Sequence, residues 1–141
     1  MRHIVFIIII GTILQAQAMK SQNHYSANIQ WLPTQEIREG DQIIKTLAFK
    51  EQTGHINLLP VIHYEIDAIG KLLPSDSIDI SMTDTTWIYA TPEENAILRQ
   101  RLDKESPIVS HTINTERKNS FVLVTILPYR EVKEGVFQKM V

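Results

Sequence analysis

The stretch Phe121-Val122-Leu123-Val124-Thr125-Ile126-Leu127 decides the fold of this chain. Apolar residues occupy both alternating sets of positions, and several of the side chains have the β-branching that strands favour. A short run of this kind is typical of a strand in the middle of a sheet that is covered on both faces. We therefore expect this segment to form the centre of the hydrophobic core of a β protein.

The residues on either side of this run extend the β pattern. Residues 108–115 are separated from it by the polar segment 116–120, which predicts an antiparallel hairpin. Earlier in the chain, Ile78, Ile80 and Met82 alternate with polar residues, as expected of a half-buried strand. Further strands are predicted at turn-separated intervals over residues 25–31 (ended by Pro33), 42–49, 61–66, 85–89 and 136–141, and an apolar run covers residues 56–59 before Pro60.

One helix interrupts the strands. Thr91-Pro92-Glu93-Glu94 combines a capping hydroxyl, a proline suited to the first helical position and an acid that can reach back to the cap. We expect the helix to run to about Asp103. Seven or eight short strands with one helix indicate an antiparallel β-sandwich, here a single domain over residues 25–141 that continues beyond the end of the chain.

The first eighteen residues have the features of a secretory signal peptide. Positive charge at Arg2 precedes the apolar stretch from Ile4 to Leu14, which is shorter than the ~20 residues needed to span a bilayer. Ala16 and Ala18 then provide the small residues that signal peptidase reads, so cleavage is expected after Ala18. The protein is therefore predicted to be exported to the periplasm or outer-membrane surface, with residues 19–24 flexible and no stable membrane span after cleavage; an uncleaved membrane anchor is the lesser alternative.

Composition excludes several functions. The formal net charge is −2 and the basic residues are scattered, whereas nucleic-acid binding needs concentrated Lys and Arg. With no cysteine, the chain has no disulfide and no thiol nucleophile. Its histidines lack the paired spacing of a metal site, and no serine-nucleophile motif occurs in residues 19–141. We expect no catalytic residue, no metal and no cofactor.

The end of the chain suggests an interaction surface. Gly135 introduces the strand-like run Val136-Phe137-Gln138-Lys139-Met140-Val141, which has no polar tail after it. Apolar groups at a terminus must find something to bury against. We expect Val136, Phe137, Met140 and Val141 to form an exposed edge that a protein partner, or the continuation of this chain, covers.

The aromatic residues on strands suggest a second function. Trp31, Trp87 and Tyr89 could form a stacking platform for glycan or peptide on a secreted sandwich. Aromatic residues on strands more often belong to the core, because they bury the largest area. A free-standing binding module is therefore the alternative function.

Several short motifs, in their order along the chain, carry a resemblance to a known family. The sequence resembles the N-terminal region of the PorU-type sortases of the type IX secretion system in Bacteroidetes, which belong to the gingipain family of cysteine peptidases. The motifs are Ile29-Gln30-Trp31, Leu47-Ala48-Phe49, Leu59-Pro60 with Tyr64, Ile88-Tyr89-Ala90-Thr91-Pro92-Glu93-Glu94, Ile126-Leu127-Pro128-Tyr129-Arg130 and Val136–Val141.

The resemblance implies an accessory, propeptide-like β-domain of a cell-surface peptidase that trims the secretion signals of exported cargo. In that family an export signal and a β-rich leading domain precede a caspase-like catalytic domain. The catalytic histidine and cysteine of the family have no counterpart in this chain, so no catalytic residue is carried over. The implied partner is a peptidase catalytic domain or another component of the secretion system.

Overall fold

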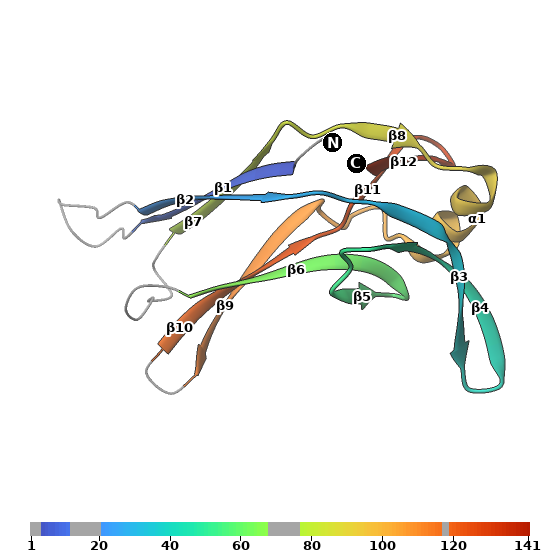
Figure 1. Cartoon of the computed structure of the whole chain (residues 1–141), viewed down its shortest axis with the longest axis horizontal. Coiled ribbons are helices and arrows are strands. Elements are labelled where there is room, and N and C mark those ends of the chain that lie inside the picture. The colour runs from blue at the N-terminus through green and yellow to red at the C-terminus, as the bar shows by residue number, and fades with distance from the viewer. Residues whose placement is uncertain (1–3, 12–20, 68–76, 117–118) are drawn as a thin grey trace.

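A computed structural model of the 141-residue chain describes residues 4–11, 21–67, 77–116 and 119–141. It is mainly β, with antiparallel sheets and, within the described residues, one short helix (Figure 1). The elements are β1 (Ile4–Gly11), β2 (Ser21–Ala27), β3 (Trp31–Glu39), β4 (Gln42–Phe49), β5 (Gly54–Ile56), β6 (Leu59–Asp67), β7 (Ser77–Thr83), β8 (Trp87–Tyr89), α1 (Pro92–Arg101), β9 (Val109–Glu116), β10 (Asn119–Ile126), β11 (Tyr129–Lys133) and β12 (Val136–Met140).

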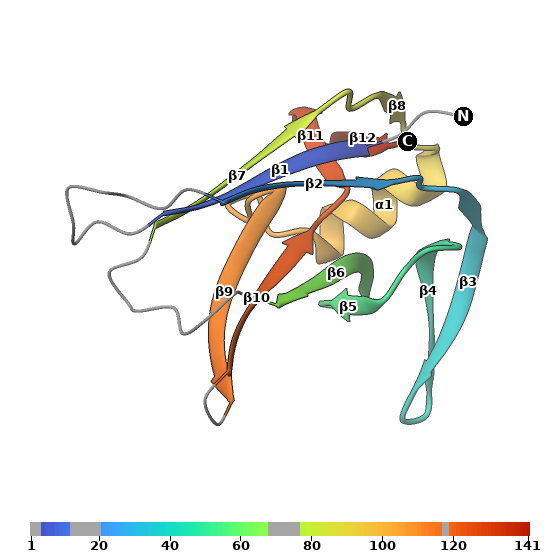
Figure 2. The same ribbon diagram turned by 60° about the vertical axis from the view of Figure 1, so that its left-hand side comes forward.

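The strands form four hydrogen-bonded groups with the orders β2-β1-β7, β5-β6-β10-β9, β11-β12-β8 and β3-β4. In both ribbon views the β2-β1-β7 sheet runs across the face of the four-stranded sheet (Figures 1 and 2). The β11-β12-β8 sheet and α1 lie together at one end, and the β3–β4 hairpin projects from the body of the molecule.

Strand β10 is the core strand that its sequence predicts, and it pairs with β6 on one side and β9 on the other. Val122, Val124 and Ile126 are fully buried on its inner face. Its outer face is only half-buried, so the expectation of cover on both faces is wrong. The reason lies in the neighbours: Leu123 pairs with Glu65 of β6 and with a threonine of β9, which keep this face polar.

Two hydrophobic clusters fill the interior. The first joins buried residues of β4, β6, β7, β10 and β12, and the second joins residues of β4, β6, α1, β11 and β12. Trp31 packs against both clusters from the start of β3. Its ring centroid lies 5.1 Å from that of Phe49 and 5.7 Å from that of Tyr129, so one side chain links the two halves of the core.

The prediction of the helix is confirmed. Thr91 is the N-cap, and its side chain accepts from the Glu94 backbone N–H while the Glu94 carboxylate accepts from the Thr91 backbone N–H. Pro92 occupies the first turn. The helix ends at Arg101, two residues before the expected end.

Two segments differ from what the sequence pattern indicates. Pro33 does not end a strand; it lies inside β3, where the register with β4 shifts between Leu32 and Gln35, and an irregularity of this kind accommodates proline. The apolar run 56–59 is not one continuous segment, because it contains a hairpin turn. Asn57 and Leu58 both have positive φ (49° and 67°), which places them between β5 and β6 in a tight two-residue connection.

The N-terminal part of the chain contains strands that the sequence pattern does not indicate. Residues Ile4–Gly11, inside the predicted leader, form β1 between β2 and β7. The segment 19–24 is predicted to be flexible, and the structure describes it only from Ser21 onward. Residues Ser21–His24 belong to β2. Cleavage of the leader stays a prediction, and Ala16 and Ala18 lie outside the described residues.

Candidate functional site

The predicted apolar edge at the end of the chain is not exposed. Strand β12 pairs with β11 on one side and β8 on the other, and Phe137 and Met140 are buried while Val136 and Val141 are half-buried. The Val141 backbone N–H donates to the carbonyl of Thr86 at 2.8 Å. The expectation of an open edge here is therefore wrong, because β8 and β11 supply the pairing that the run was expected to seek elsewhere.

The three aromatic residues proposed as a platform do not share one surface. Trp31 is a core side chain, and its indole Nε1 donates to the Met140 carbonyl at 2.8 Å. Trp87 and Tyr89 lie two residues apart on β8 and so share a face of that strand. Tyr89 is 66 % exposed, and the Arg130 guanidinium lies 4.3 Å from the Trp87 ring centroid.

A buried ion pair between Lys139 and Glu94 lies beside Trp31. The Lys139 ammonium lies 2.7 Å from a Glu94 carboxylate oxygen, and both side chains are nearly fully buried. Lys139 also lies 4.6 Å from the Trp31 ring centroid.

The Tyr129 hydroxyl donates to the Pro60 carbonyl at 2.7 Å. Burial, and then the nearby Glu94 charge, raise the Tyr129 pKa well above its ordinary value.

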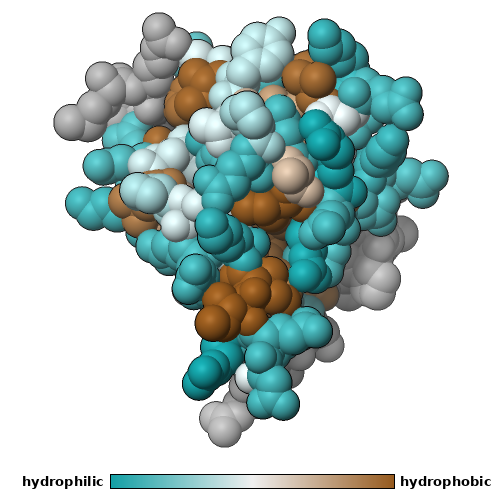
Figure 3. Space-filling model, turned by 90° about the vertical axis from the view of Figure 1, so that its right-hand side faces the viewer, coloured by the Kyte–Doolittle hydropathy of each residue, from teal (hydrophilic) through white to brown (hydrophobic). Residues whose placement is uncertain are grey.

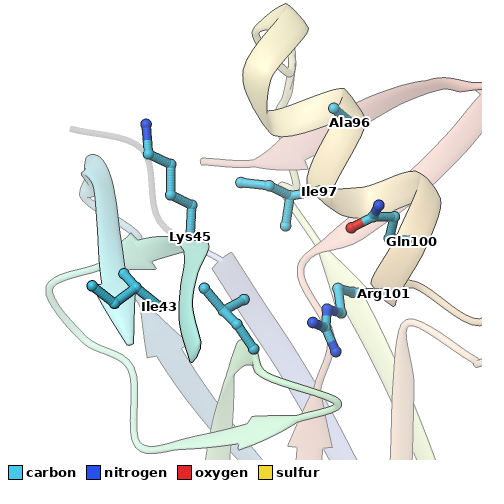
Figure 4. Close-up of a pocket in the computed structure, with 7 residues that line it drawn as sticks. Ile43, Lys45, Ala96, Ile97, Gln100 and Arg101 are labelled. Carbon is cyan, nitrogen blue, oxygen red and sulfur yellow. The ribbon is translucent and has the colours of Figure 1, made fainter. Parts of the chain in front are cut away.

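One surface feature of the described residues is a groove between the β3–β4 hairpin and α1, which we call the hairpin–helix groove. It encloses about 330 Å³ (Figure 4). This volume is at the small end of ligand sites, so the groove suits one or two side chains of a partner. Its lining residues are Ile43, Ile44, Lys45, Ala96, Ile97, Gln100 and Arg101.

The two walls of the groove come from distant parts of the chain. Ile97 extends from α1 toward the hairpin, and Lys45 stands on β4 at one end (Figure 4). The Lys45 ammonium lies 3.3 Å from the Glu93 carboxylate across the groove, with both side chains more than half exposed. At the other end, the Arg101 guanidinium forms no ion pair with any acid of the described residues. The groove therefore combines an apolar floor with an ion pair at the Lys45 end and, at the other end, the Arg101 cation that no acid of the described residues neutralises.

The face shown in Figure 3 carries exposed apolar surface. Figure 3 shows apolar side chains near the centre of this face and again below it, separated and rimmed by polar ones. Ile43 is 62 % exposed, although it belongs to a strand. An apolar area with a polar rim is the usual form of a protein-binding surface. Chemically, the groove offers apolar surface from Ile44, Ala96 and Ile97 beside the polar Gln100 and the cationic Arg101.

One wall of this groove is readable from the sequence. Helical spacing favours a shared face for Ala96, Ile97 and Arg101 of the short helix, whereas the position of the hairpin opposite them is not readable from the sequence. The adjacent isoleucines Ile43 and Ile44 were the available signal, because they put apolar side chains on both faces of a two-stranded hairpin.

The described parts of the chain hold neither a metal-binding cluster nor a membrane-spanning helix. No group of three or more His, Asp or Glu residues there is placed to hold a metal ion. No helix there has the length and apolarity needed to cross a bilayer.

Comparison of the chain with protein-family models, with curated proteins and with solved structures finds no match. Assignment of a function therefore depends on the residues and contacts described above.

Proposed function

We propose that this chain is a non-catalytic β-sandwich domain that resembles the N-terminal domain of PorU-type sortases, and that it packs against a gingipain-type catalytic domain outside this chain. In this proposal the sheet to which β2 and β7 belong and the four-stranded sheet are the two layers of the sandwich. The shared cluster supports this reading, because Ile78 of β7 packs with Ile66 of β6 and Val122 of β10.

The motifs that carry the resemblance meet in one place. Trp31 packs on Phe49 and Tyr129, and Tyr129 is hydrogen-bonded to the Pro60 carbonyl. Lys139, from the last motif, pairs with Glu94 of the helix motif. Short motifs spread over more than a hundred residues thus define a single core, which supports reading them as the signature of a domain.

The observation that carries the proposal is the exposed apolar surface at the hairpin–helix groove. Ile43 presents most of its surface to solvent beside Ile97, on a hairpin that projects from the body. Such an arrangement favours a protein partner over a small molecule, because the groove is open and its apolar surface continues onto the hairpin. The domain is proposed to work after export, in the periplasm or at the outer-membrane surface.

Co-expression with a gingipain-type catalytic domain encoded by the same genome tests this proposal. We expect a 1:1 complex on size-exclusion chromatography, and Ile43→Asp should weaken it by at least about tenfold. Val132→Asp is the matched control, since Val132 is also exposed (42 %) but lies on β11 and does not line the groove. Failure to form the complex, or equal loss in both variants, counts against the proposal.

The alternative binding module retains support from one observation. On the β11-β12-β8 sheet, Trp87, Tyr89 and Arg130 gather on one surface, with Arg130 donating two hydrogen bonds to the Gln138 side-chain oxygen at 2.6 and 2.8 Å. An aromatic ring beside polar groups can stack and orient a sugar. Titration with an oligosaccharide panel, followed by tryptophan fluorescence, tests it: saturable quenching that Trp87→Phe abolishes favours the module, and a constant signal eliminates it.

A further inference from the structure

Strand β1 is the middle strand of its sheet. Seven of its residues pair with β2, from Ile4 opposite Ala27 to Ile10 opposite Ser21. Seven also pair with β7, from Val5 opposite Thr83 to Gly11 opposite Ser77. Within the described residues, β2 and β7 have no other strand partner. The same segment is the apolar part of the leader that the sequence predicts to be removed.

Removal of residues 1–18 would leave β2 and β7 facing each other across the width of one strand, about 10 Å. Both are held in place by the rest of the fold. On β7, Ile78 is buried in the first hydrophobic cluster and Ile80 and Met82 pack against it. The chain after β2 is anchored by Ile29, also buried in that cluster. The two strands would thus keep their separation but lose the backbone hydrogen bonds that they make with β1. Unpaired backbone groups raise the free energy of the folded state, so an open slot is unfavourable.

We propose that β2 and β7 form an acceptor slot that, once the leader has been cleaved, takes an extended segment of a partner protein as the missing middle strand. This inference depends on leader cleavage and does not rest on the proposed function. The incoming segment must run antiparallel to both strands, as β1 does. Pairing through main-chain hydrogen bonds gives such a segment affinity, and side chains at alternate positions give it specificity.

The slot defines the sequence pattern of its occupant. Positions 6, 8 and 10 of β1 are in register with Met82, Ile80 and Ile78, whose side chains belong to the core side of β7. Asp79 and Ser81, between them, are exposed. The partner segment should therefore carry apolar residues at three alternate positions, with polar residues tolerated between them. Seven residues of this pattern fill the slot.

Expression of the full gene in an exporting bacterial host, followed by intact mass, is the first test. We expect the exported protein to begin at Met19. In that protein, hydrogen exchange should be at least about 100-fold faster for the amides of β2 and β7 than for those of β10, since the former lack partners. A synthetic probe with the sequence of residues 4–11 between pairs of lysines should then slow the exchange of both strands at least about tenfold. The same peptide with Ile7→Pro and Ile9→Pro should have no effect, because proline cannot donate a hydrogen bond.

A pair of neighbouring variants separates slot filling from general peptide adhesion. Ile80→Asp places a charge on the core side of the slot and should abolish protection by the probe. Ser81→Asp places the same charge on the exposed side and should leave protection unchanged. Slow exchange of the β10 amides in both variants verifies that the rest of the domain is folded.

Several outcomes would overturn the inference. If the exported protein still contains residues 4–11, the slot is filled by the chain itself. If β2 and β7 are already protected in the monomeric exported protein, the slot has closed. Protection that appears only with concentration-dependent dimerisation would make a second copy the occupant, and failure of the probe to protect would show that no strand is accepted. None of these results changes the outcome expected for Ile43→Asp, which measures binding of a catalytic domain at the hairpin–helix groove. A failure of the acceptor-slot proposal can therefore be distinguished from a failure of the proposed function.

Discussion

Replacing Lys139 by methionine tests the buried pair that joins the last strand to the helix. The Lys139 and Glu94 side chains are only 8 % and 5 % exposed, and their charged atoms lie 2.7 Å apart. Methionine keeps the length and apolar stem of lysine but removes the charge. The Glu94 carboxylate then retains only the Thr91 backbone N–H among its hydrogen bonds within the described residues. A buried carboxylate without its cation is expected to destabilise the protein by about 3–5 kcal/mol.

That loss is a large part of the 5–15 kcal/mol by which a domain of this size is typically stable. Urea denaturation followed by tryptophan fluorescence measures it, with Trp31 as a reporter because Lys139 lies against its ring. The double variant Glu94→Gln/Lys139→Met should lose only about 1 kcal/mol, since glutamine can still accept from Thr91 and no buried charge remains. We therefore expect a coupling free energy of at least about 2 kcal/mol between the two positions.

Lys45→Met is the matched control. Lys45 and Glu93 form an ion pair of similar composition at 3.3 Å, but their side chains are 60 % and 51 % exposed. Solvent screens such a pair, so its loss should change the free energy of unfolding by less than about 1 kcal/mol. The reasoning is refuted if Lys139→Met is no more destabilising than Lys45→Met, or if the double-variant cycle gives no coupling.

Three further substitutions probe local features, each by the free energy of unfolding. Tyr129→Phe removes the hydrogen bond to Pro60 and should destabilise by about 1–2 kcal/mol at pH 7. Because burial and a nearby carboxylate raise the Tyr129 pKa, the neutral form is favoured in the folded state; wild-type stability should fall as the pH rises above about 10, and the deficit of the variant should shrink there. Thr91→Ala should cost about 1 kcal/mol and reduce helix content, with full stability refuting the capping role. Gly54→Ala should cost about 1–2 kcal/mol, because its Cβ would lie 2.6 Å from the His63 ring; a gain in stability would mean that the ring moves freely.

Features specified by neighbouring residues could be predicted from the sequence. The cap at Thr91 needs only residues 91–94, and the β9–β10 hairpin needs only two strand-forming runs and a polar connection. Both are present as predicted. In each case the hydrogen-bond partners lie close along the chain, so local composition is sufficient.

Features that depend on distant partners were missed. The turn at Asn57 and Leu58 is held from outside: the Asn57 side chain donates to the Arg101 carbonyl at 2.7 Å, and Thr46 donates to the Leu58 carbonyl. A leucine with positive φ is unfavourable by itself, and contacts with the helix end and β4 compensate for it. No local pattern around residue 58 indicates these partners, so the apolar run 56–59 showed no sign of the turn.

The candidate site divides in the same way. Ala96, Ile97 and Arg101 share a face because of helical spacing, which the sequence contains. The opposite wall of the groove depends on how the β3–β4 hairpin sits against α1, which no spacing specifies. For residues 136–141 the apolar character is evident from the sequence, but their pairing partner is not. β8, a strand of only three residues, covers the edge that was expected to be free.

The two ends of the molecule differ in how their strands are completed. Around Trp31, residues from the start, middle and end of the described chain complete one another: the indole donates to Met140, Lys139 pairs with Glu94, and β12 has a strand on each side. Here the closing strand β12 obtains both of its strand partners from the described part of the chain itself. At the other end, β2 and β7 are completed only by a segment that carries the features of a cleaved leader. A partner strand is therefore to be sought between β2 and β7, while a partner surface is to be sought at Ile43 and the groove.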